Sequence, residues 1–316
     1  MVSAAFRFFK MSTPVYPHQL DVYATLRETA ETFFSGQWRS LRLQPRFARL
    51  VVGPSGSGKT HVMRILADDI GVPLFSVGTT NWLPMGCSER GSRPTWLDIA
   101  RFIRSNCRGI IFLDELDKLA YPTSWMTYIR VELFSCLDGK VPDNLRIVHE
   151  DDEEDEPPDF TLRVATTASA LRKNFLVVGG GAFQSLWTAG KGSVGFGAIP
   201  DRPKCSLNHS QIAAVIPVEL GNRFASPVLS ISTLVATDYE AMLACALRQL
   251  PQEFHEEVKK CAKQTLDQAV EHGLGCRWIE QLLLAASIRL RQSTLAKVAN
   301  GSDIVEKPDE TQISPL

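Results

Sequence analysis

The sequence predicts an α/β fold with a mainly parallel sheet, followed by a small domain made only of helices. Between residues 46 and 231, short apolar runs typical of buried strands alternate with amphipathic segments, and strands joined through helices pair in parallel. After residue 236 the strand-like runs stop and only helical periodicity remains. The 316 residues are 44% apolar, which supplies a sizeable core and excludes a disordered or collagen-like chain.

Strands are expected where runs of apolar residues are short and continuous. In chain order these runs are 46–52, 72–77, 109–115, 175–181 and 227–231. The run 109–115, GIIFLDE, is the most strand-like segment in the chain. The run 175–181, FLVVGGG, leads directly into glycines, so we expect it to be a buried strand that ends without side chains.

Helices are expected where apolar residues recur at helical spacing. These segments are 18–35, 59–71, 95–105, 125–138, 237–250, 251–273 and 276–298. Gly71 and Gly139 are expected to end two of them, because glycine readily adopts the left-handed conformation after a helix. Thr95 is expected to be the N-cap of the helix that follows it, since its hydroxyl can accept a hydrogen bond from a free N–H.

We expect four parts along the chain. They are an N-terminal arm and helix (1–44), a large α/β domain (45–235), a small helical domain (236–299) and a flexible tail (300–316). The large domain is expected to contain an acidic insertion over 140–170, because residues 149–159 hold eight acidic residues and no Lys or Arg.

Basic residues gather toward the N-terminus. Residues 1–64 contain nine Lys or Arg and three acidic residues, although the net charge of the whole chain is −1. Four arginines lie just before the first clear strand: Arg39, Arg42, Arg46 and Arg49. An ordinary solvated surface is the simpler interpretation, and a patch that binds nucleic acid or an acidic partner is the alternative.

The seven cysteines are scattered and contain no Cys-x-x-Cys pair. This spacing argues against a disulfide framework and against a zinc site, and it suits a reducing cytosol. No apolar run reaches the roughly 18 residues that a membrane helix requires. We therefore expect a cytoplasmic protein without a membrane partner.

A glycine-rich turn at residues 53–60, GPSGSGKT, fits the phosphate-binding pattern G-x-x-x-x-G-K-[ST] in full and lies between an expected strand and an expected helix. Its glycines let backbone N–H groups turn toward phosphate oxygens, and the helix N-terminus adds partial positive charge. Lys59 is expected at the β- and γ-phosphates, and Thr60 offers a hydroxyl to Mg²⁺. The whole turn is the predicted nucleotide-binding site of a P-loop NTPase: Gly53, Pro54, Ser55, Gly56, Ser57, Gly58, Lys59 and Thr60.

A second motif, IIFLDELDK (110–118), places two carboxylates at the end of a strand. Ligands of open α/β sheets bind at the carboxyl ends of the strands. Asp114 is therefore expected to help Thr60 hold Mg²⁺, and Glu115 to act as the general base that polarises the attacking water. The two motifs together predict a nucleotide hydrolase that uses ATP and Mg²⁺.

Six segments occur in the order found in AAA+ ATPases. They are GPSGSGKT (53–60), IIFLDELDK (110–118), NFLVVGGGAF (174–183), SVGFGA (193–198), IPVELGNRF (216–224) and GCRWI (275–279). The chain most resembles the Clp-type branch, ClpX and HslU, over about residues 45–290. The resemblance implies an αβα sandwich followed by a helical lid, assembled as a ring homo-oligomer, with a hexamer expected.

The resemblance also implies roles for two arginines. Arg223, in GNRF, is similar to the arginine finger that reaches the γ-phosphate bound by a neighbouring subunit. A planar, permanently charged guanidinium suits that role because it neutralises charge in the transition state. Arg277, in GCRWI, is similar to the sensor-2 arginine of the lid, although an alignment shifted by a few residues would leave no such arginine. Surface or salt-bridging roles are the alternatives for both.

Two segments depart from the Clp-type pattern. The strand over 175–181 ends in glycines and offers no polar sensor-1 side chain. The region after the second strand, 79–96, contains Trp82, Met85 and Trp96 but no aromatic–hydrophobic pore-loop motif. Threading of a polypeptide through a ring is therefore not indicated by the sequence.

The expected function is ATP hydrolysis that drives the remodelling of a protein, or of a protein–nucleic acid complex. The alternative is an ATP-dependent adaptor or loader that acts on DNA or a partner protein without threading. A small-molecule kinase would also use a P-loop. The Asp-Glu strand end, Arg223 and the C-terminal helices argue against that third class.

Overall fold

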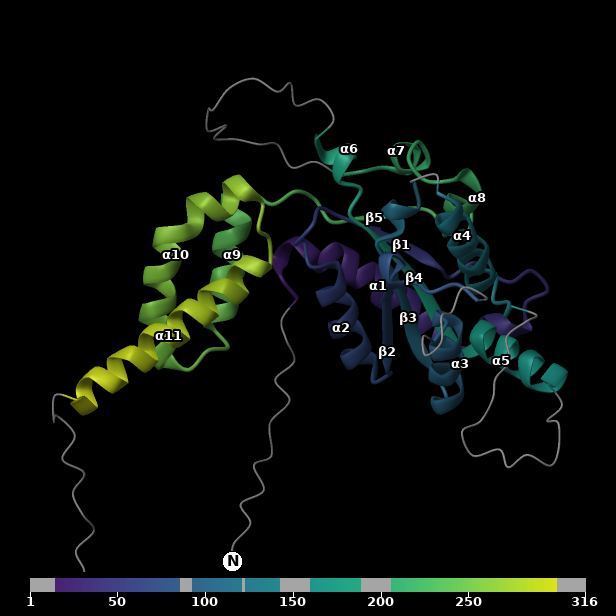
Figure 1. Ribbon diagram of the computed structural model, residues 1–316, viewed down its shortest axis with the longest axis horizontal. Coiled ribbons are helices and arrows are strands. Elements are labelled where there is room, and N and C mark those ends of the chain that lie inside the picture. The colour runs from purple at the N-terminus through teal and green to yellow at the C-terminus, as the bar shows by residue number, and fades with distance from the viewer. Residues whose placement is uncertain (1–14, 86–92, 121–122, 143–159, 189–205, 300–316) are drawn as a thin grey trace, which may run out of the picture.

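The computed structural model describes residues 15–85, 93–120, 123–142, 160–188 and 206–299. Figure 1 shows an α/β body beside a group of C-terminal helices. The body contains a five-stranded sheet with the strand order β2-β3-β4-β1-β5, and every neighbouring pair is parallel. The strands are β1 (Arg49–Val52), β2 (Leu74–Gly78), β3 (Gly109–Asp114), β4 (Phe175–Gly181) and β5 (Leu229–Ser230). The predicted α/β fold with a parallel sheet is confirmed.

Helices cover both faces of this sheet. The side chains of successive strand residues alternate between two apolar clusters, so that Val51 faces one cluster and Leu50 and Val52 face the other. The first cluster lies under α1 (Leu20–Ser35) and α2 (Lys59–Ile70). The second lies under the other three long helices of the body: α3 (Thr95–Ser105), α4 (Ser124–Leu137) and α5 (Phe160–Asn174). Burial on both faces explains why the strands are continuous apolar runs.

Short helical turns connect these elements. They are η1 (Pro17–Gln19), η2 (Gln37–Ser40), η3 (Thr79–Asn81), η4 (Leu116–Ala120), α6 (Gln184–Thr188), α7 (His209–Ala213) and α8 (Val218–Gly221). Two of them matter for the site, because η3 follows β2 and η4 follows β3 at the carboxyl edge of the sheet.

The C-terminal helices α9 (Ala236–Leu247), α10 (Gln252–His272) and α11 (Arg277–Ala299) confirm the expected all-helical segment. They enclose an apolar cluster of their own, which also takes in Tyr16 from the N-terminal segment. Pro251 is the N-cap of α10, and Gly273 and Gly275 both have a φ of +62° where the chain turns into α11. None of the described helices has the length and apolar character needed to cross a membrane.

Two expectations about local structure are wrong. The predicted insertion over 140–170 extends too far, because α5 begins at Phe160 and buries Thr167 and Leu171 in the core. Thr95 is the first residue of α3 and not its N-cap, which is Pro94. Its hydroxyl instead accepts a hydrogen bond from the Leu83 N–H at 2.8 Å, so it closes a loop and does not cap the helix.

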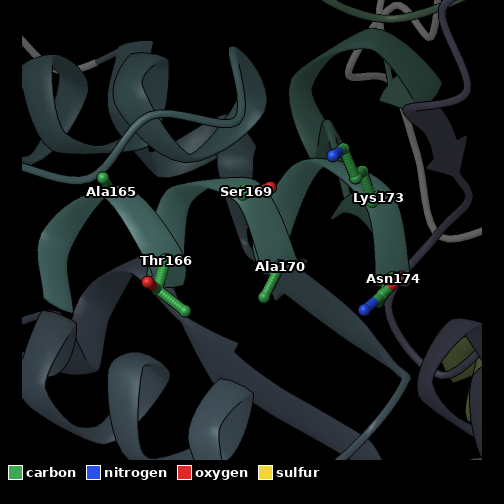
Figure 2. A pocket seen from close by; sticks show the side chains of 6 residues that line it. All are labelled: Ala165, Thr166, Ser169, Ala170, Lys173 and Asn174. Atoms are coloured by element: carbon green, nitrogen blue, oxygen red, sulfur yellow. The ribbon is translucent and has the colours of Figure 1, made fainter. Parts of the chain in front are cut away.

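Small side chains on the outer face of α5 leave an open hollow of about 450 Å³ (Figure 2). Its lining is Ala165, Thr166, Ser169, Ala170, Lys173 and Asn174. Predicted features at 143–159, 190–198 and 300–316 lie outside the described residues.

The glycines that end β4 are required by the side chains packed against them. A Cβ atom on Gly179 would lie 2.6 Å from Leu116 Cδ1 and 2.7 Å from Phe224 Cε1. A Cβ atom on Gly180 would lie 2.5 Å from Phe112 Cζ and 3.0 Å from Asp114 Oδ1. The strand therefore presents backbone alone beside the acidic pair, in agreement with the predicted lack of a polar side chain there.

We predict that Gly180→Ala destabilises the protein, because the added methyl group must displace the ring of Phe112. Overpacking of this kind costs about 1–3 kcal/mol. The urea midpoint of unfolding, followed by circular dichroism, should fall accordingly. Gly221→Ala is the control, since its Cβ atom would meet only Ile216 Cδ1, at 3.8 Å. Equal midpoints for the two variants would contradict the packing argument.

Candidate functional site

The structure brings the two predicted motifs together at the carboxyl edge of the sheet. The glycine-rich turn follows β1 and the acidic pair ends β3, with β4 between these two strands. The Thr60 hydroxyl donates a hydrogen bond to Asp114 Oδ2 at 3.1 Å. A hydroxyl and a carboxylate oxygen are thus adjacent, which is the oxygen donor set that suits Mg²⁺.

The backbone of the glycine-rich turn is shaped as a phosphate site requires. Gly56 and Gly58 have φ values of +81° and +88°, which a residue with a side chain rarely adopts. A Cβ atom on Gly53 would lie 2.6 Å from Ser57 Oγ. That buried hydroxyl has no hydrogen-bond partner among the described residues. An unpaired buried polar atom is costly, so the turn suits a ligand with hydrogen-bonding oxygens.

Lys59 is oriented by its own turn. Its side chain is 9% exposed, and Nζ donates to Gly53 O at 2.8 Å and to Pro54 O at 3.2 Å. Burial lowers the pKa of Lys59, and the positive charge of Arg277 lowers it further. The negative charges of Asp114 and Asp117 raise this pKa, but burial is the largest cause. The two hydrogen bonds therefore hold the ammonium group at its own turn.

Glu115 is held in an unusual backbone conformation. Its φ is +61°, a left-handed value that costs a residue other than glycine about 1–3 kcal/mol. Its N–H donates to Asp114 Oδ1 at 2.8 Å, and its carbonyl oxygen accepts from the Thr79 hydroxyl at 2.7 Å. The Thr80 hydroxyl donates to Glu115 Oε2. The η3 turn thus contacts both the backbone and the carboxylate of Glu115.

Thr79 and Thr80 were not predicted from the sequence. They follow β2 in a polar stretch without a recognisable motif, and only the neighbouring positions of β2 and β3 in the sheet bring them to Glu115. Thr79 and Thr80 could have been identified from the sequence only if the pairing of β2 with β3 had been inferred first.

The N-terminus of α11 rests on the glycine-rich turn. The Cys276 N–H donates to Gly56 O at 2.7 Å, and a Cβ atom on Gly275 would lie 2.2 Å from the same oxygen. Arg277 is the first residue of α11, is exposed, and lies near enough to affect the pKa of Lys59. Arg277 thus lies at the end of α11 that contacts the turn.

The segment before α1 also contacts the turn, next to Cys276. Gln19 Nε2 donates to Ser57 O at 3.0 Å, and His18 Nε2 lies 3.2 Å from the same oxygen. Tyr16 stacks on His61 with 5.2 Å between ring centroids. These residues were also missed, because no local pattern links them to residues 53–60.

Arg223 lies on the surface formed by α4 and α8. Its guanidinium makes a bidentate ion pair with Asp138, with N–O distances of 3.1 Å, and donates to Glu219 O at 2.7 Å. Its Cζ atom lies 4.2 Å from the ring centroid of Phe134. None of these contacts within the described residues involves the chain's own glycine-rich turn. The side chain remains 24% exposed, so a neighbouring molecule can reach it.

Three of the four N-terminal arginines bind the chain's own atoms. Arg39 Nη2 donates to Lys173 O at 2.6 Å, Arg46 Nη1 to Asn222 O at 2.5 Å, and Arg49 Nη1 to Ser226 O at 3.0 Å. These bonds join the segment before β1, and the first residue of β1 itself, to the rest of the body. They support a structural role, and the alternative of a free basic patch is correspondingly weakened.

The aromatic residues after β2 are not available to a substrate. Trp82 and Trp96 are 2% and 0% exposed and belong to the core cluster under α3 and α4. Residues 86–92 lie outside the described part of the loop. The described part therefore lacks an exposed aromatic side chain.

Comparisons with known proteins agree with this geometry. Residues 49–148 match the model of the ATPase family associated with various cellular activities (AAA). An ATP-dependent zinc metalloprotease FtsH from Methylococcus capsulatus is 35% identical over 96 residues, which are 30% of this chain and 15% of the relative. An ATP-dependent clpX-like mitochondrial chaperone from Saccharomyces cerevisiae is 35% identical over 122 residues, 30% of this chain and 23% of the relative.

The chain thus spans less than a quarter of the length of these two relatives. The matched family region runs from β1 past α4 and includes the glycine-rich turn and the acidic pair. Since the similar proteins include both an FtsH and a ClpX-like protein, the comparisons support the AAA family without selecting a branch.

We predict that Gly275→Ala separates α11 from the glycine-rich turn, because no methyl group fits 2.2 Å from Gly56 O. Hydrogen exchange measured by mass spectrometry should then show faster exchange of the Cys276 amide. Gly273→Ala is a matched control, since Gly273 has the same φ of +62° but no atom within 4 Å of its Cβ position. Equal exchange in the two variants would show that the contact is not specific.

Proposed function

We propose that this protein couples ATP hydrolysis to the remodelling of a protein partner, because residues 49–148 match the model of the ATPase family associated with various cellular activities (AAA). The contact between Thr60 and Asp114 is the observation that carries the proposal. It joins the glycine-rich turn and the acidic pair, which are 54 residues apart in the chain, into one site. The two halves of a phosphoanhydride-hydrolysing site are then adjacent.

Each residue of this site has a proposed role. The backbone of residues 53–60 and the ammonium group of Lys59 bind the phosphates, and Thr60 and Asp114 hold Mg²⁺. Mg²⁺, when bound, neutralises phosphate charge. Glu115 accepts a proton from the attacking water, and Thr80 and Thr79 fix its position. Arg277 contributes positive charge from the lid beside Lys59.

We propose that the protein works as a ring, with Arg223 acting on the nucleotide of the neighbouring subunit. Arg223 is partly exposed and contacts α4 and α8, so a second copy can approach it. Its pairing with Asp138 keeps the guanidinium ordered until a phosphate replaces the carboxylate. A hexamer of the Clp type is the proposed assembly, with an ATPase domain over 45–235 and a lid over 236–299 that moves on it.

The partner is proposed to be a protein in the cytoplasm. The FtsH and ClpX-like relatives are a protease and a chaperone by name, and the arginines of the N-terminal segment are used internally. The alternative, an adaptor or loader that does not thread its partner, is favoured by the burial of Trp82 and Trp96. A pore-loop aromatic must be exposed to grip a polypeptide.

We predict that Glu115→Gln keeps ATP binding and loses most of the turnover, because an amide cannot accept the proton from water. Calorimetry measures binding, and phosphate release measures hydrolysis. The expected decrease in kcat is on the order of 10²- to 10⁴-fold. Lys59→Ala is the contrasting variant, because it should weaken ATP binding itself. Unchanged turnover in Glu115→Gln would exclude Glu115 as the base.

We predict that mixing Arg223→Ala with Glu115→Gln restores part of the activity that each variant lacks. In mixed rings, some sites combine an intact Glu115 with an intact Arg223 from the neighbour. Loss of a transition-state arginine costs on the order of 10³-fold in rate, so partial recovery is measurable. Specific activity of the wild type should also rise with protein concentration. No recovery, together with a concentration-independent rate, would contradict the ring and the role of Arg223.

A further inference from the structure

Glu132 is a buried carboxylate in the middle of α4. It is 8% exposed and has no ion-pair partner among the residues that the structure describes. Its neighbours on the same helix face are buried apolar residues: Ile129, Leu133 and Cys136. Burial raises the pKa of Glu132, while hydrogen bonds from Trp82 and Met85 lower it. Because a buried carboxylate is costly and an apolar residue would pack here, its role must lie in what it binds.

Each carboxylate oxygen of Glu132 accepts one hydrogen bond from the segment after β2. Trp82 Nε1 donates to Oε2 at 2.7 Å, and the Met85 N–H donates to Oε1 at 2.6 Å. The segment is also bonded to the start of α3, since the Thr95 N–H donates to Leu83 O at 3.0 Å. The two acceptors of Glu132 therefore fix this segment against α4.

The fixed segment continues directly into the turn that contacts Glu115. The Trp82 N–H donates to Thr79 O at 3.3 Å, which ends η3. Thr79 and Thr80 then bind the carbonyl oxygen and the carboxylate of Glu115. A Cβ atom on Gly78 would lie 2.9 Å from Glu115 Oε2, so the turn and the carboxylate are closely packed. Three hydrogen bonds, through Trp82 and Thr79, thus connect Glu132 to the proposed base.

We infer that Glu132 is a positioning residue for Glu115, acting through Trp82 and the η3 turn. Its catalytic consequence rests on the proposed ATP hydrolysis, whereas the positioning itself is a property of the folded chain. Glu132 orients η3 so that Thr80 holds the Glu115 carboxylate at the carboxyl end of β3. Small displacements of a catalytic group lower the reaction rate strongly, since a shift of about 1 Å can slow the reaction on the order of 10²-fold.

The test uses Trp82→Phe, which removes the indole N–H and keeps an aromatic ring in the core. Trp38→Phe is the matched control, because Trp38 is similarly buried and its Nε1 donates to Phe33 O at 2.8 Å, in the cluster on the opposite face of the sheet. Without nucleotide, hydrogen exchange should accelerate in peptides covering 79–85 and 114–118 of Trp82→Phe only. Acceleration confined to 79–85, or equal in both variants, would overturn the inference.

Kinetics provide the second readout. Trp82→Phe should lower kcat about 10-fold with little change in the KM for ATP, and Trp38→Phe should change neither. If Glu132 acts through Thr80, adding Thr80→Val to Trp82→Phe should lower kcat no further than Thr80→Val alone. If the losses in kcat of the two single variants add in the double variant, Trp82 and Thr80 act independently on Glu115, which would contradict the inference.

A second variant covers the case in which Trp82→Phe does not fold. Glu132→Gln preserves the size of the side chain, but its NH₂ group must face one of the two N–H donors. It should give the same exchange pattern and the same kinetic change as Trp82→Phe. If the wild-type protein hydrolyses no ATP, the proposed function is wrong, and the exchange experiment still decides the positioning role.

Discussion

The parallel pairing of β1, β4 and β3 is the constraint on which the site depends. Val52 lies opposite Gly181, and Leu113 lies opposite Gly179, so all three strands end at one edge. The P-loop and the acidic pair can meet across β4 because that strand ends in glycines. A side chain at Gly180 would have to displace the ring of Phe112 and would press on the Asp114 carboxylate, which bonds Thr60.

The P-loop is enclosed by segments from both ends of the chain. Gln19 and Cys276 contact it side by side, with Gln19 Nε2 3.5 Å from Cys276 Sγ. Tyr16 joins the apolar cluster of the C-terminal helices while stacking on His61 of α2. The N-terminal segment therefore links the C-terminal helices to the body beside the turn.

Helix α4 serves both parts of the proposed machinery. Its middle carries Glu132, which holds the segment that leads to Glu115. Its C-terminal end carries Phe134 and Asp138, which hold Arg223. One rigid element thus supports the proposed base for the chain's own site and the proposed arginine for the next site.

The sequence by itself determined the α/β class, the five strands, the P-loop and the pair Asp114–Glu115. These features have a local signal, because a run of apolar residues, a helical period or a glycine spacing is complete within a few residues. The sequence failed where the local signal was ambiguous. The acidic run that precedes α5 led us to assign the first turns of this helix to the insertion. Thr95 was expected to cap α3, but its hydroxyl bonds the preceding loop instead.

Only the tertiary structure decided the contacts of Thr80, Gln19 and Glu132. Thr80 reaches Glu115 because β2 and β3 are neighbours, and Gln19 reaches Ser57 because the N-terminal segment lies between the lid and the P-loop. Glu132 has a sequence signal, a carboxylate on an apolar helix face, but its partners lie 47 and 50 residues away. Such contacts depend on the order of the strands and on how helices cover them, and no short segment of the chain specifies either.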